Sequence, residues 1–235
     1  MADASFGTIV VLSGAGVSAE SGLPTFRGGG GLWEGHRVEE VATPGAFARD
    51  PQLVYRFYNQ RRAKLRDAAV APNPAHLALA ELERSWPGEF LLVTQNVDDL
   101  HERAGSRRLV HLHGELMRGL CRACGTSSPW EGDMDAASVC PRCAAAGRLR
   151  PDIVWFGEMP YRMDEVYAAL ERCAIFVAVG TSGVVYPAAG FVEAARGART
   201  IELNLEPSAM SSAFLERRQG AAAELVPALV RELLR

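Results

Sequence analysis

Long hydrophobic runs and a strong net charge are both missing from this sequence. No apolar run reaches the roughly 18 residues that a membrane span needs. Residues 1–8 are too few and too polar for a secretory signal, and a net charge of −3 gives no general attraction to nucleic acid. We therefore expect a cytoplasmic protein that binds neither membranes nor nucleic acid.

Cysteine is also scarce, with five in 235 residues. Four of them form two C-x-x-C pairs, a spacing that in a reducing compartment indicates a metal rather than disulfides. Four thiolates would complete a tetrahedron around zinc and leave no position for water, so the metal is expected to be structural. The alternative is a redox-active dithiol pair. The expected ligands are Cys121, Cys124, Cys140 and Cys143.

Repeats and low-complexity linkers are absent, but a glycine-rich stretch follows the first apolar run. Residues 8–12 predict a buried strand, and residues 14–19 (GAGVSA) then fit the dinucleotide pattern G-x-G-x-x-G/A. Such glycines let the backbone approach a pyrophosphate, and the next helix N-terminus attracts that anion. The alternative is a glycine turn of the kind found in any α/β protein.

The helix after this turn is expected to be short, because Gly22, Pro24 and the glycines at 28–31 cannot lie inside a long helix. We expect a loop here that carries Phe26, Arg27 and Trp33 and closes over a cofactor. No acidic residue ends a second strand at the usual spacing, which argues against an ordinary Rossmann dehydrogenase.

Apolar strands are predicted near residues 8–12, 90–94, 109–112, 174–179 and 200–205, and they alternate with helices. This pattern predicts an α/β fold, a Rossmann-like, largely parallel, doubly wound sheet. Two regions interrupt the alternation and predict a smaller inserted domain with a helical module and the zinc ribbon. The expected domains are 1–27, 76–114 and 156–235 for the Rossmann-like part, and 28–75 and 115–155 for the small part.

The strand predicted at 89–96 ends in the polar residues Gln95 and Asn96, and Asp98 follows them. Open α/β sheets bind ligands at this end of a strand, and a turn or N-cap role is the alternative for each residue. Residues 107–116 predict another strand, with His111 and His113 on one face. The pair could bind metal, but no third histidine or carboxylate lies at ligand spacing. One of the two could instead be a general base, although a structural role is the common alternative. His76 is expected to cap or pack a helix.

The clear helix at residues 51–68 carries Tyr58 and Arg61, three residues apart on one side. A solvated arginine pair, Arg61 with Arg62, competes with an anion-binding role for Tyr58 and Arg61. Further along, residues 153–156 form an extended apolar run that Gly157 ends.

Six motifs together resemble one family, the sirtuins. In order they are GAGVSAESGLPTFRG from Gly14, TQNVDDLH, HLHGEL, the four cysteines, GTSGVVYPAA and ELNLEPS. Over nearly its whole length the chain is similar to NAD-dependent protein-lysine deacylases of the bacterial CobB-like, class III branch. The resemblance implies that NAD and an acyl-lysine peptide share a cleft between the two domains. Separately, we expect a monomer.

The resemblance also assigns residues. NAD contacts would come from Gly14, Ala15, Gly16, Ser18, Glu20, Thr25, Phe26, Arg27, Trp33, Gln95, Asn96, Asp98, Gly180, Thr181, Ser182, Asn204, Leu205, Glu206 and Ala222. Substrate contacts would come from Ala42, Tyr58, Arg61, Val154, Phe156, Gly157, Glu158 and Val184. The peptide would add as a strand between residues 154–159 and 183–186.

The family chemistry implies that His113 is the catalytic base. The acyl oxygen attacks C1′ of the nicotinamide ribose, nicotinamide leaves, and His113 helps to deprotonate a ribose hydroxyl that attacks the imidate. The products are lysine and O-acyl-ADP-ribose. Tyr58 and Arg61 match the class III pair that binds acidic acyl groups, with Ala42 widening the pocket. We therefore expect removal of acetyl and of succinyl or malonyl groups, with protein mono-ADP-ribosylation as the alternative activity.

Overall fold

The computed structural model describes residues 6–25, 32–33 and 36–235, and its centre is a sheet of six parallel strands. The strand order is β11-β10-β9-β1-β4-β5. Numbered along the chain, this is the 6-5-4-1-2-3 order of a doubly wound Rossmann-like sheet, which confirms the predicted fold class. The strands are β1 (Thr8–Ser13), β4 (Phe90–Thr94), β5 (Leu109–His111), β9 (Cys173–Val179), β10 (Arg199–Asn204) and β11 (Glu216–Gln219).

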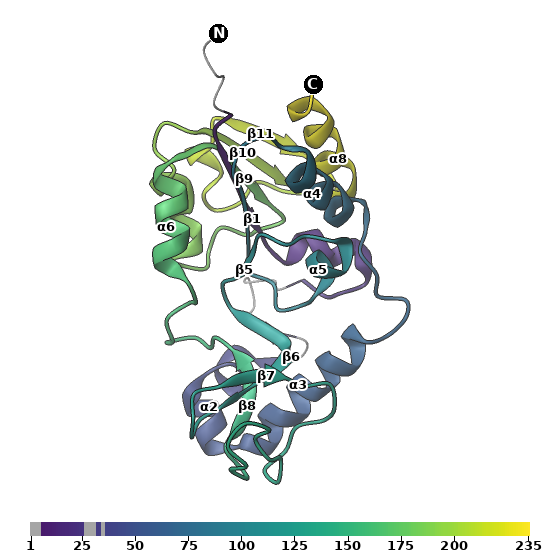
Figure 1. The fold of residues 1–235 in the computed structure, drawn as a ribbon, viewed down its shortest axis with the longest axis vertical. Coiled ribbons are helices and arrows are strands. Elements are labelled where there is room, and N and C mark those ends of the chain that lie inside the picture. Colours follow the sequence, from purple (N-terminus) through teal and green to yellow (C-terminus); the bar gives the residue numbers. More distant parts are fainter. Residues whose placement is uncertain (1–5, 26–31, 34–35) are drawn as a thin grey trace.

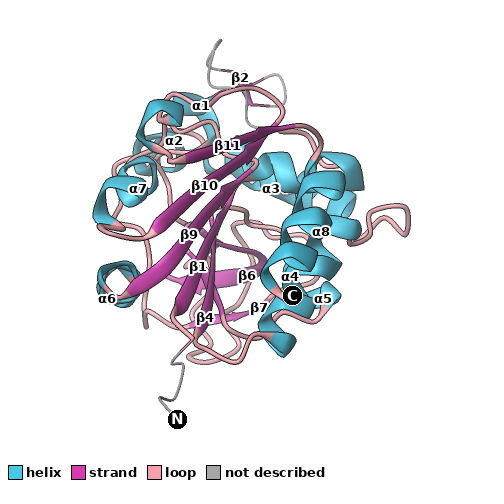
Figure 2. Ribbon diagram, turned by 90° about the horizontal axis from the view of Figure 1, so that it is seen from above, coloured by secondary structure: helices cyan, strands magenta, loops and turns pink. Residues whose placement is uncertain are grey.

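Helices cover both faces of this sheet (Figure 2). Successive side chains of β1 enter different cores: Ile9 and Val11 pack on the side of α4 and α8, and Val10 and Leu12 pack on the side of α6 and α7. A strand buried on both faces explains why β1 is continuously apolar. One face carries η1 (Ala15–Ser21), α4 (Pro74–Ser85), α5 (Leu100–Ala104) and α8 (Ala222–Leu233); the other carries α6 (Met163–Glu171), η2 (Ala188–Gly190) and α7 (Phe191–Ala194), and η3 (Ser211–Ala213) precedes β11.

A smaller unit with its own core lies at the opposite end of the molecule (Figure 1). Its helices begin where the sequence places capping residues: Thr43 accepts a hydrogen bond from Ala46 N, and Asp50 accepts one from Leu53 N. The elements are β2 (Leu32–Trp33), β3 (His36–Arg37), α1 (Val38–Val41), α2 (Pro44–Arg49), α3 (Pro51–Leu65) and an antiparallel sheet of β6 (Gly114–Cys121), β7 (Ser127–Pro129) and β8 (Leu149–Ile153).

The strands differ from the sequence-based expectations in three places. The single strand expected at 107–116 is divided between two sheets, because β5 ends at His111 and β6 begins at Gly114, where φ is +84°. The extended run expected at 153–156 is mostly an irregular segment after β8. The edge strand β11 was missed because its sequence, ERRQ, has no apolar residue; parallel pairing with β10 and an Arg199–Glu216 ion pair hold it in place.

The turn after β1 contacts the turn after β9, at the position in the sheet where the strand order reverses. Gly14 N donates to Val179 O (3.0 Å), and Gly16 N donates to Gly180 O (2.8 Å). A Cβ at Gly16 would lie 2.6 Å from Gly180 Cα, and a Cβ at Gly180 would lie 2.4 Å from Val17 N. The glycines are therefore required by contact between the two turns, a role that the motif alone did not predict.

Replacing Gly16 with alanine should destabilise the protein by roughly 2–3 kcal/mol, because the new methyl group meets backbone atoms that cannot move independently. Urea unfolding measures the change. Gly132→Ala is the matched control, since nothing lies within 4 Å of its added Cβ. Equal stability of the Gly16→Ala variant and the wild type would show that the turns are not in tight contact.

Candidate active site

A cleft of about 850 Å³ lies where the carboxyl ends of the central strands face the smaller unit. The turns after β1, β4, β9 and β10 form one side, and α3 and the segment after β8 form the other. Ligands of open α/β sheets bind at this edge, and the volume is within the usual range for small-molecule sites.

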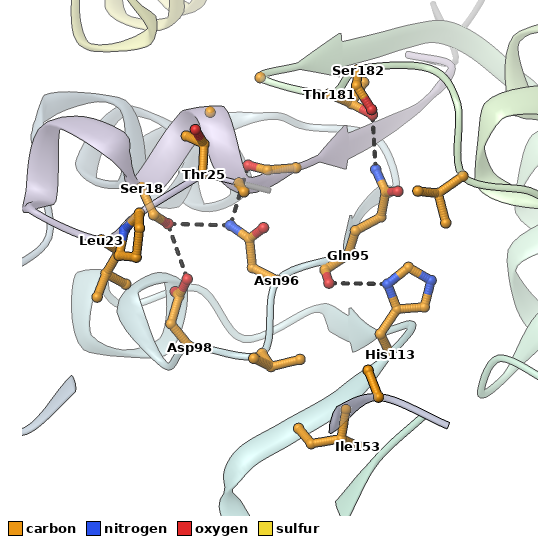
Figure 3. Close-up of a pocket in the computed structure, with 18 of the residues that line it drawn as sticks. Ser18, Leu23, Thr25, Gln95, Asn96, Asp98, His113, Ile153, Thr181 and Ser182 are labelled. Atoms are coloured by element: carbon orange, nitrogen blue, oxygen red, sulfur yellow. Dashed lines mark hydrogen bonds between the residues drawn. The ribbon is translucent and has the colours of Figure 1, made fainter. Parts of the chain in front are cut away.

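Hydrogen bonds tie together three polar residues on the sheet side (Figure 3). Asn96 Nδ2 donates to Ser18 Oγ (3.1 Å) and Gly14 O (3.2 Å), and Ser18 Oγ donates to Asp98 Oδ2 (3.1 Å). Burial raises the pKa of Asp98, although its hydrogen bonds from Leu100 N and Ser18 oppose the shift. The three predicted binding residues thus form one preorganised wall.

Behind this wall, Ser18 is connected to two buried histidines, His76 and His101. The sequence did not predict that these residues form one network. His76 Nδ1 accepts from Asn73 N (3.3 Å), so its Nε2 carries the hydrogen and donates to Ser18 Oγ (3.4 Å). The His101 ring lies 4.8 Å from the His76 ring, and its Nε2 bonds Ser13 Oγ at 2.9 Å. Burial lowers the pKa of both histidines, that of His76 to about 4, which keeps both imidazole rings neutral at pH 7.

The two neighbouring histidines have different surroundings. His113 lines the cleft, and its Nδ1–H donates to Gln95 O (3.1 Å; Figure 3), which leaves the lone pair on Nε2. Burial lowers the pKa of His113 and the Gln95 hydrogen bond only partly offsets it. His111 Nδ1–H donates to Asn96 O (3.2 Å) and its Nε2 lies 2.6 Å from Glu102 Oε1. Burial lowers its pKa, but Glu102 outweighs this effect, so the pKa is raised.

The expectation that no carboxylate lies at ligand spacing from these histidines was wrong. Carboxylates do lie near His111, because α5 brings Glu102 and β6 brings Glu115 to it, with the ligand atoms within 4.8 Å of one another. The sequence could not show this, since the β5–β6 division sets the geometry. His111 is therefore an ion-pair residue beside the cleft, and His113 is the histidine that faces it.

Side-chain amides connect the ends of β4, β9 and β10. Gln95 Nε2 donates to Thr181 Oγ1 (3.1 Å), and Asn204 Nδ2 donates to Thr181 O (2.7 Å). These bonds hold the turn after β9 to the ends of β4 and β10. Ser182 is exposed at the same rim.

On the opposite side, α3 presents Tyr58 and Arg61 to the cleft. Trp155 Nε1 donates to Tyr58 Oη (3.0 Å), and complete burial raises the tyrosine pKa, so the phenol stays neutral. The Arg61 guanidinium lies 5.5 Å from the Phe57 ring centroid. Arg61 and Arg62 are not a solvated surface pair, because Arg62 is buried. This residue is 1% exposed, and its Nε donates to Leu116 O (3.1 Å).

The segment after β8 is anchored by its backbone. Val154 N donates to His113 O (2.9 Å), and Phe156 N donates to Ala42 O (3.0 Å). Glu158 forms a bidentate ion pair with Arg150, both contacts at 2.8 Å, and the Arg150 hydrogen bonds help to lower its pKa against the effect of burial. Glu158 therefore already has a structural partner within the cleft wall.

Most of the expected site residues line the cleft, and six are not among its lining residues: three of these lie outside the lining, and for the other three the structure describes no side chain. Glu20 Oε2 accepts from Ala223 N (3.0 Å), so Glu20 lies with Ala222 at the start of α8. Val184 is half exposed, outside the lining. Phe26 and Arg27 fall outside the described residues, as does the Trp33 side chain. Those that do line it are Gly14, Ala15, Gly16, Ser18, Thr25, Ala42, Tyr58, Arg61, Gln95, Asn96, Asp98, His113, Val154, Phe156, Gly157, Glu158, Gly180, Thr181, Ser182, Asn204, Leu205 and Glu206.

The four paired cysteines converge far from this cleft's polar wall, in the smaller unit. All four Sγ atoms lie within 4.8 Å of one another, with Cys121–Cys143 at 3.8 Å and Cys124–Cys140 at 3.9 Å. Four sulfurs at Zn–S distances of 2.3 Å are about 3.8 Å apart in a tetrahedron, so the donor set fits zinc. None of these cysteines is in a disulfide.

Comparison with known proteins shows the family. A profile described as the Sir2 family matches residues 14–187. An NAD-dependent protein deacylase of Bdellovibrio bacteriovorus is 56% identical over 229 residues, covering 97% of each chain. One of Vibrio cholerae is 55% identical over 228 residues, covering 96% of this chain and 93% of that protein.

Solved structures agree. A Sir2 homologue in complex with NAD has a TM-score of 0.86 at 43% identity, covering 96% of this chain and 89% of the other. A mutant homologue with 2′-O-acetyl ADP ribose has a TM-score of 0.86 at 42% identity, covering 96% and 91%. A third, bound to a myristoylated histone peptide, has a TM-score of 0.74 at 35% identity, covering 96% and 90%.

The chain therefore belongs to the Sir2 family, the sirtuins. It is an NAD-dependent protein deacylase, and the four-cysteine cluster is consistent with structural zinc. Among the described residues, no helix has both the length and the apolar character required to cross a membrane.

Cys143→Ser should remove the zinc, since three thiolates no longer close the tetrahedron. Elemental analysis should find one zinc per wild-type chain and almost none in the variant, with Tm lowered by roughly 5–10 °C. Cys173→Ser, at a buried cysteine in β9, is the control and should retain the metal. Full zinc occupancy in Cys143→Ser would contradict the assignment.

Proposed function

We propose that this deacylase removes succinyl and malonyl groups as well as acetyl groups from protein lysines. The observation that carries the proposal is that Tyr58 and Arg61 reach the same cleft as His113. A phenol and a guanidinium both donate hydrogen bonds to a carboxylate, and the arginine charge offsets the cost of removing that carboxylate from water.

The surroundings of Tyr58 and Arg61 support this role. The raised pKa of Tyr58 keeps its hydroxyl protonated while Trp155 donates to the oxygen, so the phenol can act as a donor. Arg61 keeps its charge, since guanidinium does not lose its proton in proteins. Ala42, which is buried in the wall of the same cleft, leaves room for an acyl chain longer than acetyl.

We further propose that His113 is the general base. Its tautomer leaves the Nε2 lone pair available, and its lowered pKa keeps the ring neutral at pH 7. The Gln95 carbonyl fixes the ring orientation. Bound NAD supplies the ribose that accepts the acyl group, while Ser18, Asn96 and Asp98 would form the polar wall for its nicotinamide half.

The remaining assignments stay proposals. Acylated peptides would enter beside residues 154–157, which line the cleft; a homologue is known in complex with a myristoylated histone peptide. The domain boundaries, the cytoplasmic location and the monomeric state are expectations from the sequence. So are the NAD contacts assigned to Glu20, Phe26, Arg27, Trp33 and Ala222, and the substrate contact of Val184.

The pH profile tests His113. A base with a lowered pKa is deprotonated at neutral pH, so kcat/KM for deacetylation should rise with pH through a value below 6.5 and be flat above pH 7. The His113→Gln variant should be slower by about 100-fold or more, and its kcat/KM should no longer rise with pH in this range. A limb centred above pH 7 that persists in His113→Gln would exclude His113 as the base.

The Arg61→Met variant tests whether Arg61 binds the carboxylate of acidic acyl groups. Loss of a charged hydrogen bond should lower kcat/KM for a succinyl peptide by about 10- to 100-fold, while an acetyl peptide changes about twofold or less. Arg56→Met, at an exposed arginine of α3 outside the cleft lining, is the control. Mass spectrometry with and without NAD measures acyl loss and detects ADP-ribose left on protein. Equal losses on both peptides would overturn the selective role.

A further inference from the structure

The basic residues of this chain are almost entirely arginine. Of its 25 lysine and arginine residues, 24 are arginine and one is lysine, Lys64. The chain therefore carries a single side-chain amine, although the reaction it catalyses acts on acylated amines of other proteins.

This lysine lies at the cleft. Lys64 is in the last turn of α3, is exposed to solvent, and lines the cleft together with Tyr58, Arg61 and Leu65. It follows Arg61 by three residues, so the two side chains project from the same side of the helix with Cβ atoms about 5–6 Å apart. The only amine side chain thus borders the proposed acidic acyl site.

We propose that Lys64 is an acylation site that controls the binding of acidic acyl groups. This inference rests on the proposed desuccinylase function. The unprotonated Nζ attacks the carbonyl carbon of a succinyl thioester, the C–S bond breaks, the thiolate leaves, and the amine proton passes to water. The product is an amide, and the charge at position 64 changes from positive to negative.

The new carboxylate has a partner within reach. A lysine side chain extended by a four-carbon acyl group is longer than the spacing of about 5–6 Å between positions three apart on a helix. The succinyl carboxylate can therefore fold back onto the Arg61 guanidinium and form a charge-assisted hydrogen bond. Arg61 is then occupied when a succinyl-lysine substrate arrives, whereas an acetyl-lysine substrate does not need it.

The single lysine makes the experiment selective. Wild type and Lys64→Arg are treated with a succinyl thioester, and intact mass and peptide mapping give the fraction modified at Lys64. Each sample is compared with its own untreated protein, so modification of the N-terminal amine is shared by both. The initial rates of NAD-dependent deacylation of a succinyl peptide and of an acetyl peptide are then measured.

Once Lys64 is mostly modified, the treated wild type should deacylate the succinyl peptide at least fivefold more slowly than the untreated wild type. Its rate on the acetyl peptide should change by less than twofold. Treated Lys64→Arg should keep its own untreated rates on both peptides. Full modification of Lys64 without loss, or an equal loss in Lys64→Arg, overturns the inference. An untreated wild type that does not act on the succinyl peptide instead refutes the proposed function on which the inference depends.

Discussion

The contact between the two glycine turns determines where the polar residues of the cleft lie. Gly14 and Gly16 after β1 bond Val179 and Gly180 at the end of β9, and the Cβ distances leave no space for a side chain between them. Because the strands are parallel, the polar ends of β1, β4, β9 and β10 lie at one edge of the sheet, and the contact between the turns fixes the spacing of β1 and β9 there. Asn96 and Asn204 then bond backbone carbonyls of these two turns and fix their orientation.

The second side of the cleft depends on an independent core. Aromatic packing among Phe47, Tyr55, Tyr58 and Trp155 holds α2, α3 and the segment after β8 together. Buried Arg62 joins α3 to β6 through the Leu116 carbonyl. An arginine without water needs several acceptors, and its donation to Asn59 Oδ1 and Gly132 O supplies them. The acyl side of the site therefore rests on packing that is separate from the sheet.

Local patterns predicted the parallel sheet and the four-cysteine cluster. A buried strand such as β1 is recognisable as a run of apolar residues, and the spacing of the two C-x-x-C pairs predicts a tetrahedral zinc site. Features set by distant segments were not predictable. Glu102 meets His111 only because the chain leaves the sheet after β5, and His76 meets His101 only because α4 packs on α5. Strand β11 lacks apolar residues, and its pairing with β10 decides its conformation.

The division between β5 and β6 has a thermodynamic consequence for His113. The chain crosses from one sheet to the other over Leu112 and His113. The ring of His113 is bonded to Gln95 at the large sheet, and its carbonyl accepts from Val154 at the small one. The Gln95 hydrogen bond raises the proton affinity of His113. By linkage, a movement of the two sheets that lengthened this bond would lower that affinity, and protonation of His113 would oppose the movement.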